Sequence, residues 1–311
     1  MVDLQFKCTK LFVVQGLKNG YIGGPFQNEF ELDSGVVLSI ISKFGKINIE
    51  LTSNSPMKCD EFINIFQNID KLLMLFDGRF YTIEKLIVST DKAESRDILN
   101  EYNSIRLNCF YSKELYKYSW LKINLLQDVL TKDLYDKWCS LISDLDIAFQ
   151  MFLYALSDNK MTIDLNFAFL VELAEPFTEL VKNSTNYCQS LTPGKRKTTL
   201  KDCIYNLIVI YGTDIFANEL KDDYTSFLEM VVNSRVRIMH IKKNQENFFD
   251  GNECIKYSLK FSVLYRKILL SLLDVPYQKY KENIINISKK IDDWMIIDLI
   301  VHFLKINFHI K

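Results

Sequence analysis

Hydrophobic and polar side chains alternate along much of the segment 1–120, which is the pattern of β-strands. Residues 47–51 place isoleucine or leucine at every second position, and residues 105–109 repeat this alternation. Such a period of two predicts strands with one buried and one wet face, as in antiparallel sheets. Apolar or β-branched runs predict further strands at residues 11–14, 36–41 and 80–88.

One helix is predicted between these strands. Apolar residues spaced three or four apart run from Phe62 to Phe76 and form a single stripe, and the pair Asp77-Gly78 follows it. This spacing matches the helical period, and glycine is the preferred residue just past a helix end. Strands with one helix among them predict a small sandwich-like or α+β domain over residues 1–120.

From Thr131 onward the hydrophobic period changes to that of α-helices. Thr199 and Asp202 are spaced like a capping box, which marks the start of one helix, and Pro176 predicts a kink in another. Residues 121–311 are therefore predicted to form an all-α bundle, so that the fold class is α+β. The predicted helices cover residues 131–152, 163–181, a segment that begins at 199, 223–241 and 251–274.

Composition narrows the classes of function. The chain has 38 basic and 39 acidic residues, so a basic nucleic-acid coat is excluded and any RNA contact requires a local patch. Seven cysteines without a C-x-x-C pair argue against a disulfide framework and a zinc knuckle. The longest apolar stretch, residues 294–304, is interrupted by Asp298 and is too short to span a bilayer. We expect a cytoplasmic protein with no membrane contact and no cofactor.

Arg235 and His240, separated by four residues, are the candidate catalytic pair. Histidine suits proton transfer because its unperturbed pKa, about 6.5, leaves both protonation states available near neutrality. Arginine suits phosphate binding because its planar, permanently charged fork matches phosphate oxygens. Five residues of straight helix rotate a side chain by about 140°, so convergence requires a long arginine and a helix end at His240. Lys242 and Lys243 are compatible with such an end.

The spacing of the pair is by itself weak evidence. A histidine at a helix C-terminus and a solvated arginine remain the alternatives for His240 and Arg235. Glu172 and Glu175, three apart on the predicted second helix, either neighbour the cleft, face solvent or form an ion pair with a basic neighbour. The loop Lys195-Arg196-Lys197 is either an RNA track or a solvated turn.

The order of elements and the motif together resemble the ApeA-like HEPN family. That family has a β-rich N-terminal region, then a helical domain whose late helix carries an R-x(4–6)-H motif, the place that Arg235 and His240 occupy here. A short loop, Phe248-Phe249-Asp250, and a further helix follow, as in many such domains. One departure is Val236, because the family often has a polar residue there; Asn233 or Ser234 would supply the missing hydrogen bond.

The resemblance implies a metal-independent endoribonuclease of the HEPN type. Such enzymes are homodimers with a composite active site, in which His240 would be the general acid/base and Arg235 the phosphate clamp. The products would carry 2′,3′-cyclic phosphate and 5′-hydroxyl ends. The implied partners are RNA, with tRNA among the candidates, and a phage-derived trigger or regulatory protein, since relatives act as abortive-infection toxins. The β-rich domain would then be a sensor or regulator. The residues expected to bind RNA are Arg237, Lys242, Lys243, Asn233 and Ser234.

Other classes of function stay open at this point. A catalytically inactive HEPN-like module that binds RNA or protein is the first, and Val236 favours it. A two-domain interaction protein, whose β-rich region binds a ligand while the helices dimerise, is the second. A metallohydrolase is the least supported, because no carboxylate–histidine set has the spacing of metal ligands.

Overall fold

The structure is a computed structural model. It describes residues 4–16, 26–43, 46–78, 82–90, 94–105, 123, 126–156, 162–182, 198–242 and 244–293. The chain divides into two compact units, residues 1–144 with 156–159, and residues 145–155 with 160–311. The boundary of functional domains after residue 120 stays a prediction.

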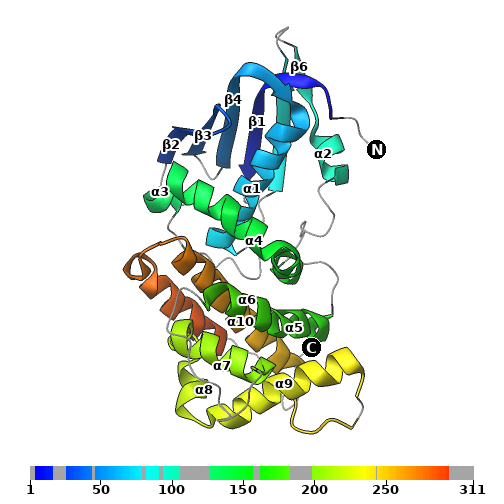
Figure 1. Cartoon of the computed structure of the whole chain (residues 1–311), viewed down its shortest axis with the longest axis vertical. Coiled ribbons are helices and arrows are strands. Elements are labelled where there is room, and N and C mark those ends of the chain that lie inside the picture. Colours follow the sequence, from blue (N-terminus) through cyan, green and yellow to red (C-terminus); the bar gives the residue numbers. More distant parts are fainter. Residues whose placement is uncertain are drawn as a thin grey trace, which may run out of the picture. The chain divides into compact units, whose positions relative to one another are not determined.

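Antiparallel strands in the first unit form one six-stranded sheet with the order β2-β3-β4-β1-β5-β6. Figure 1 shows β1 at its centre and α1 beside it. The strands are β1 (Lys7–Gly16), β2 (Phe26–Glu31), β3 (Val36–Lys43), β4 (Lys46–Lys58), β5 (Thr82–Ser89) and β6 (Ser95–Asp97).

Helix α1 (Cys59–Asp77) supplies the core of this unit. Its side chains Phe62 and Phe66 are fully buried, as are the alternate residues of the central strands that face inward. Gly78 ends the helix in the left-handed conformation and donates its N–H to the Met74 carbonyl. The predicted helix is therefore confirmed. Among the described residues the strands form one sheet covered by a helix, an α+β arrangement rather than the two facing sheets of a sandwich.

Two short helices and the start of a long one complete the first unit. They are α2 (Leu99–Ile105), α3 (Leu126–Val129) and the first half of α4 (Lys132–Leu156). Ile105 thus ends a helix, whereas the alternation had placed it in a strand; residues 106–110 of that predicted strand lie outside the described residues. The indole Nε1 of Trp138 donates to the Asn68 carbonyl of α1 at 2.8 Å, which fixes α4 on α1.

Helix α4 is long and apolar enough to cross a membrane by length and composition. Its backbone breaks at Asp146, which has φ 41° and ψ −114°, so that it is two helices rather than one straight span. Its large apolar residues Trp138, Phe149 and Phe152 are buried within the protein. These three side chains belong to the protein core, while 39% of the most apolar stretch of the helix is buried.

In the part that the structure describes, the second unit is all helical and has α10 (Gly251–Leu272) as its core helix. Tyr265 of α10 is fully buried, its ring centroid lies 4.4 Å from that of Phe177, and its hydroxyl donates to the Leu170 carbonyl at 2.6 Å. A further helix covers residues 281–293. The other elements are α5 (Ile163–Glu172), α6 (Ala174–Val181), α7 (Leu200–Tyr211), α8 (Ala217–Lys221), α9 (Tyr224–His240) and the 3₁₀ turn η3 (Tyr277–Lys279).

Two local signals in this unit act as the sequence predicts. Thr199 and Asp202 form the capping box of α7, each side chain accepting from the other's backbone N–H. The predicted 163–181 helix breaks at Leu173 into α5 and α6. Pro176 explains the position of the break, because proline has no N–H to donate to the carbonyl of Glu172, four residues earlier.

Candidate active site

Helix α9 carries the candidate pair. It begins after Asp223, whose carboxylate accepts the N–H groups of Thr225 and Ser226. One face packs inward and buries Phe227, Leu228, Val231 and Ser234. The helix ends at His240, because the next residue, Ile241, takes the left-handed conformation with φ 52°. The helix end that the sequence predicts at His240 is therefore present.

The two side chains of the motif meet at the end of this helix. Nη1 of Arg235 lies 3.3 Å from Nε2 of His240. Straight helix geometry would point them about 140° apart, but His240 is the last helical residue and the arginine chain is long enough to reach it. The guanidinium and the imidazole therefore face one space at the C-terminal end of α9, where a single phosphate could contact both.

Glu172, the last residue of α5, holds the other edge of the guanidinium. Arg235 Nε donates to Glu172 Oε2 at 2.5 Å, and Nη2 donates to Oε1 at 2.7 Å. These hydrogen bonds, followed by the nearby charges of Glu172 and Glu175, raise the pKa of Arg235, while its burial lowers it. Of the three alternatives for Glu172, the structure shows the ion pair, and its basic partner is the motif arginine itself.

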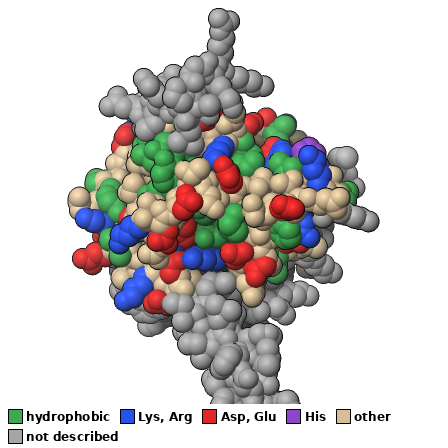
Figure 2. Space-filling model, turned by 90° about the horizontal axis from the view of Figure 1, so that it is seen from below, with side chains coloured by type: hydrophobic (Ala, Val, Ile, Leu, Met, Phe, Trp, Pro, Cys, Tyr) green, Lys and Arg blue, Asp and Glu red, His purple; other side chains and the backbone are tan. Residues whose placement is uncertain are grey.

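The pair is open to solvent on the histidine side. His240 is exposed, whereas the Arg235 side chain is 19% exposed and the Glu172 side chain is 32% exposed. Figure 2 shows histidine at the surface beside Lys or Arg side chains, on a face where acidic and basic groups are mixed. A ligand could therefore reach Nε2 and Nη1 without a rearrangement of the core.

Ser234 and Asn233 fasten the loop that follows α9. The Ser234 hydroxyl is buried; it donates to the Met230 carbonyl at 2.6 Å and accepts the N–H of Phe249 at 2.8 Å. Asn233 Nδ2 lies 3.4 Å and 3.3 Å from the carbonyls of Glu246 and Asn247. Ser234 is thus buried and hydrogen-bonded to protein groups, and its expected RNA contact stays a prediction. Neither side chain has a hydrogen bond to Arg235 or His240 among the described contacts.

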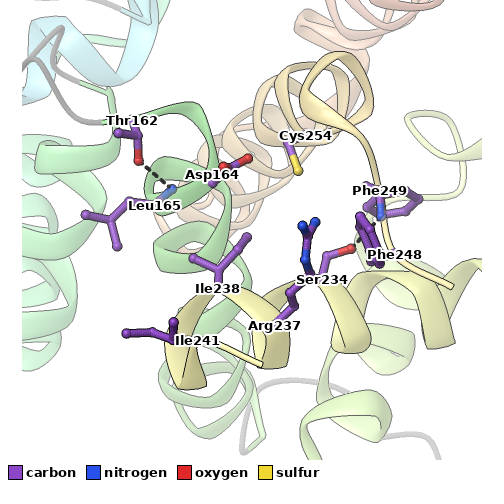
Figure 3. Close-up of a pocket in the computed structure, with 10 residues that line it drawn as sticks. All are labelled: Thr162, Asp164, Leu165, Ser234, Arg237, Ile238, Ile241, Phe248, Phe249 and Cys254. Carbon is purple, nitrogen blue, oxygen red and sulfur yellow. Dashed lines mark hydrogen bonds between the residues drawn. The ribbon is translucent and has the colours of Figure 1, made fainter. Parts of the chain in front are cut away.

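Of the remaining residues expected to bind RNA, the structure describes Arg237 and Lys242, and Arg237 does not face the pair. Arg237 lies two residues past Arg235 and therefore on another side of α9, where its Cζ is 3.7 Å from the centroid of the Phe248 ring. It lines a pocket of about 350 Å³ that includes neither Arg235 nor His240 (Figure 3). Lys242 is exposed beside His240, and its backbone N–H caps the Arg237 carbonyl. Their RNA contacts stay predictions.

Several sequence expectations fall where the structure does not describe the chain. Lys243 lies outside the described residues, as do the basic loop 195–197 and both remaining histidines, His302 and His309. Among the residues that are described, no group of three or more His, Cys, Asp or Glu side chains is placed to hold a metal ion. The expected lack of a cofactor stays a prediction.

Sequence reasoning missed two features of this region. The first is the structural position of Ser234, which its spacing could have revealed, because it lies three residues after the buried Val231 on the inward stripe. The second is the contact between Arg237 and Phe248. The loop brings Phe248 back against α9, and no local pattern in the sequence signals such a return.

Comparison with known proteins identifies the helical unit. Residues 152–279 match the family model described as Apea-like HEPN, a segment that starts in α4, ends with η3 and includes both motif residues. No curated protein and no solved structure matches the chain. With a β-rich region before it and the arginine and histidine of the motif meeting at the end of α9, the segment 152–279 of this chain is an Apea-like HEPN domain.

Proposed function

We propose that this protein is a metal-independent endoribonuclease of the HEPN type. The observation that carries the proposal is the 3.3 Å approach of Arg235 Nη1 to His240 Nε2 at an exposed helix end. The family match supports a nuclease or abortive-infection activity in general terms. The assignment of Arg235 and His240 as the catalytic residues is part of this proposal.

The proposed reaction is attack of the ribose 2′-oxygen on the adjacent phosphorus. The P–O5′ bond breaks, the 2′-hydroxyl proton leaves to a base, and a proton from an acid reaches the 5′-oxygen. The products are a 2′,3′-cyclic phosphate and a 5′-hydroxyl. His240 would carry a proton, a role that contributes typically 10²–10⁴-fold to rates. The Nη1 edge of Arg235, which does not bind Glu172, would stabilise the negative charge that builds on the phosphate oxygens.

A homodimer would complete the site. The reaction needs a base and an acid at once, and His240 is the one histidine among the described residues. A second copy related by a two-fold axis would supply the second imidazole and a second guanidinium. Met239 and Ile241, the neighbours of His240, are 38% and 82% exposed, which leaves apolar surface beside the pair for such a contact.

The proposed biological role is that of a cytoplasmic anti-phage toxin. Cleavage of cellular RNA, with tRNA among the candidate targets, would stop growth of the infected cell. The unit that contains the six-stranded sheet would serve as sensor or regulator. A phage-derived trigger or a regulatory protein would release the activity, because an unrestrained ribonuclease is harmful to its own cell.

A second candidate function is a HEPN-like module that binds RNA or protein without cleaving it. The ion pair between Glu172 and Arg235 favours this candidate, since two of the three guanidinium nitrogens already bind a carboxylate. Val236, at a position where the family often has a polar residue, favours it as well.

Purified protein and total RNA separate the two candidates. Wild type is expected to cleave RNA in EDTA and to leave 2′,3′-cyclic phosphate ends, whereas His240→Ala should lose at least about a hundredfold in rate. Lys290→Ala, an exposed change on the last described helix, is the matched control and should cleave like wild type. Equal cleavage by wild type and His240→Ala would refute the assignment. Growth arrest on expression of wild type, relieved by Arg235→Ala, would support the toxin role.

A further inference from the structure

A mixed polar and apolar pocket lies on the other side of α9 from the motif pair. It has a volume of about 350 Å³, and its walls come from the start of α5, the last turns of α9, the loop before α10 and the first turn of α10. This volume lies within the range of small-molecule sites. Ile241, the residue directly after His240, forms part of the wall, so the pocket and the motif share the end of one helix.

Arg237 and Phe248 provide a flat surface in this pocket. The guanidinium carbon lies over the phenyl ring, 3.7 Å from its centroid, in a cation–π contact. Figure 3 shows both side chains on the pocket wall, with Asp164 and Cys254 across from them. Unpaired RNA bases stack on aromatic rings and on arginine planes in this way, and each such contact contributes substantially to binding.

The charges of the pocket favour a base over a phosphate as occupant. Asp164 lines the pocket with an exposed carboxylate. Burial, followed by the charges of Asp164, Glu253 and Asp250, raises the pKa of the Cys254 thiol to about 12, whereas Arg237 lowers it. Of the lining residues, Asp164 is negatively charged and Arg237 is positively charged, so the lining lacks the excess of cations that a phosphate site needs. A carboxylate accepts hydrogen bonds from the exocyclic amino group of a base, which adenine, cytosine and guanine have and uracil lacks.

We propose that this pocket binds the nucleobase of an RNA nucleotide near the cleaved phosphate, and that it selects bases with an exocyclic amino group over uracil. Arg237 and Phe248 stack with the base, and Asp164 accepts from its amino group. This inference rests on the proposed ribonuclease function and deepens it, because it names a sequence preference for the substrate.

Binding of RNA that cannot be cleaved tests the pocket separately from catalysis. Fluorescent octamers of 2′-O-methyl adenosine, cytidine or uridine lack the attacking hydroxyl and report affinity by anisotropy. Wild type should bind the adenosine and cytidine octamers at least about fivefold more tightly than the uridine octamer. Phe248→Leu should lower affinity for the first two by at least about fivefold. Asp164→Asn should remove the preference between the three.

Two matched variants separate the pocket from general effects. Lys242→Ala removes a positive charge beside His240 that does not line the pocket, and it should weaken binding of all three octamers equally. His240→Ala should retain the full preference, because the pocket lies outside the motif pair. Loss of RNA cleavage by His240→Ala tests the proposed ribonuclease function and does not test base binding in the pocket.

Three outcomes would overturn the inference. Equal affinity of wild type for the three octamers would refute the proposed selection of bases with an amino group. An unchanged affinity of Phe248→Leu would refute the proposed stacking on Phe248. If wild type bound none of the three octamers, the pocket would not be an RNA site. Cleavage of ordinary RNA by the same preparation would still support the proposed ribonuclease function.

Discussion

Arg235 is held by Glu172 at two points and faces His240 with its third nitrogen. The contacts are Nε to Oε2 at 2.5 Å, Nη2 to Oε1 at 2.7 Å, and Nη1 to the imidazole Nε2 at 3.3 Å. A carboxylate that binds two edges of a planar guanidinium fixes its orientation as well as its position. The end of α5 therefore determines where the motif arginine presents its free edge.

Glu172→Gln is expected to lower the rate of RNA cleavage without weakening RNA binding. The amide keeps the shape of the carboxylate but can accept at only one oxygen, so the guanidinium loses one of its two fixed contacts. A misplaced catalytic group can cost about a hundredfold in rate, and we expect a fall in kcat of about tenfold or more. KM for RNA should not rise, because a negative charge is removed from the site. Steady-state cleavage of a fluorescent RNA measures both.

Glu175→Gln is the matched control for this prediction. Glu175 lies close enough for its charge to raise the pKa of Arg235, but it is exposed, and the structure gives it no hydrogen bond to the guanidinium. Glu175→Gln removes the same negative charge as Glu172→Gln but leaves both hydrogen bonds between Glu172 and Arg235 in place. We therefore expect kcat to stay near that of wild type. Similar losses in both variants would mean that charge alone, and not orientation by Glu172, affects the rate.

The fold is predictable from sequence where local signals are strong. The apolar stripe from Phe62 to Phe76 predicts the extent of α1 to within a few residues, and Gly78 predicts its end. Both signals are local, since one is a buried helix face and the other a left-handed cap. Pro176 predicts the break between α5 and α6, and the capping box predicts the start of α7. The identity of the motif pair follows from spacing and from resemblance together.

Contacts between distant segments account for what sequence could not reveal. Glu172 and Arg235 are 63 residues apart, and only the packing of α5 against α9 brings them together. Phe248 contacts Arg237 from the loop after α9, where Ile241 and Asn247 both take the left-handed conformation that isoleucine rarely adopts. The strand predicted from Ile105 onward was wrong at Ile105, which ends α2, because short apolar spacings are ambiguous between helix and strand.

Ser234→Ala is expected to destabilise the protein rather than to affect an RNA contact directly. The hydroxyl accepts the buried N–H of Phe249, and its loss leaves that donor without a partner. An unsatisfied buried N–H costs about 1–3 kcal/mol. Urea denaturation should show this loss, and amide exchange should accelerate at Phe249.

Asn233→Ala removes longer contacts at an exposed site and should cost less than about 1 kcal/mol. An equal loss of unfolding free energy in Ser234→Ala and Asn233→Ala would contradict the structural role assigned to the Ser234 hydroxyl.

Ile241→Gly is expected to stabilise the helical unit. Ile241 has φ 52° and is 82% exposed, so its side chain gains little from burial while its backbone takes a conformation that is costly for β-branched residues. Glycine takes this conformation without that cost, and the net gain should be about 0.5–1 kcal/mol. Thermal unfolding followed by circular dichroism should show a melting temperature higher by about 1–4 °C.

Ile285→Gly is the control for this substitution. Ile285 is also an exposed isoleucine, at 42%, but it lies in the helix at residues 281–293. Glycine in a helix interior costs about 1 kcal/mol, so the same chemical change should lower the melting temperature here. A melting temperature lowered by both substitutions would show that the left-handed residue at the end of α9 carries no strain.

A buried ion network joins α8, α10 and the helix at residues 281–293. The Lys260 side chain is fully buried, and its Nζ lies 2.7 Å from Glu219 Oε1 and 2.9 Å from Asp292 Oδ1. Lys256, one turn earlier on α10, lies 3.0 Å from Asp292 Oδ1. Two cations and two carboxylates thus balance their charges around a fully buried lysine.

Lys260→Met is expected to be the most destabilising of these substitutions. It leaves two carboxylates with one cation in a buried site, and removal of one partner from a buried pair costs about 3–5 kcal/mol. Lys256→Met should cost about 1 kcal/mol or less, because its side chain is 20% exposed. Adding Glu219→Gln to Lys260→Met restores the charge balance and should recover part of the loss. Urea denaturation midpoints measure the stability of the two single variants and of the double variant. A double variant no more stable than Lys260→Met would show that lost packing, rather than unpaired charge, destabilises the protein.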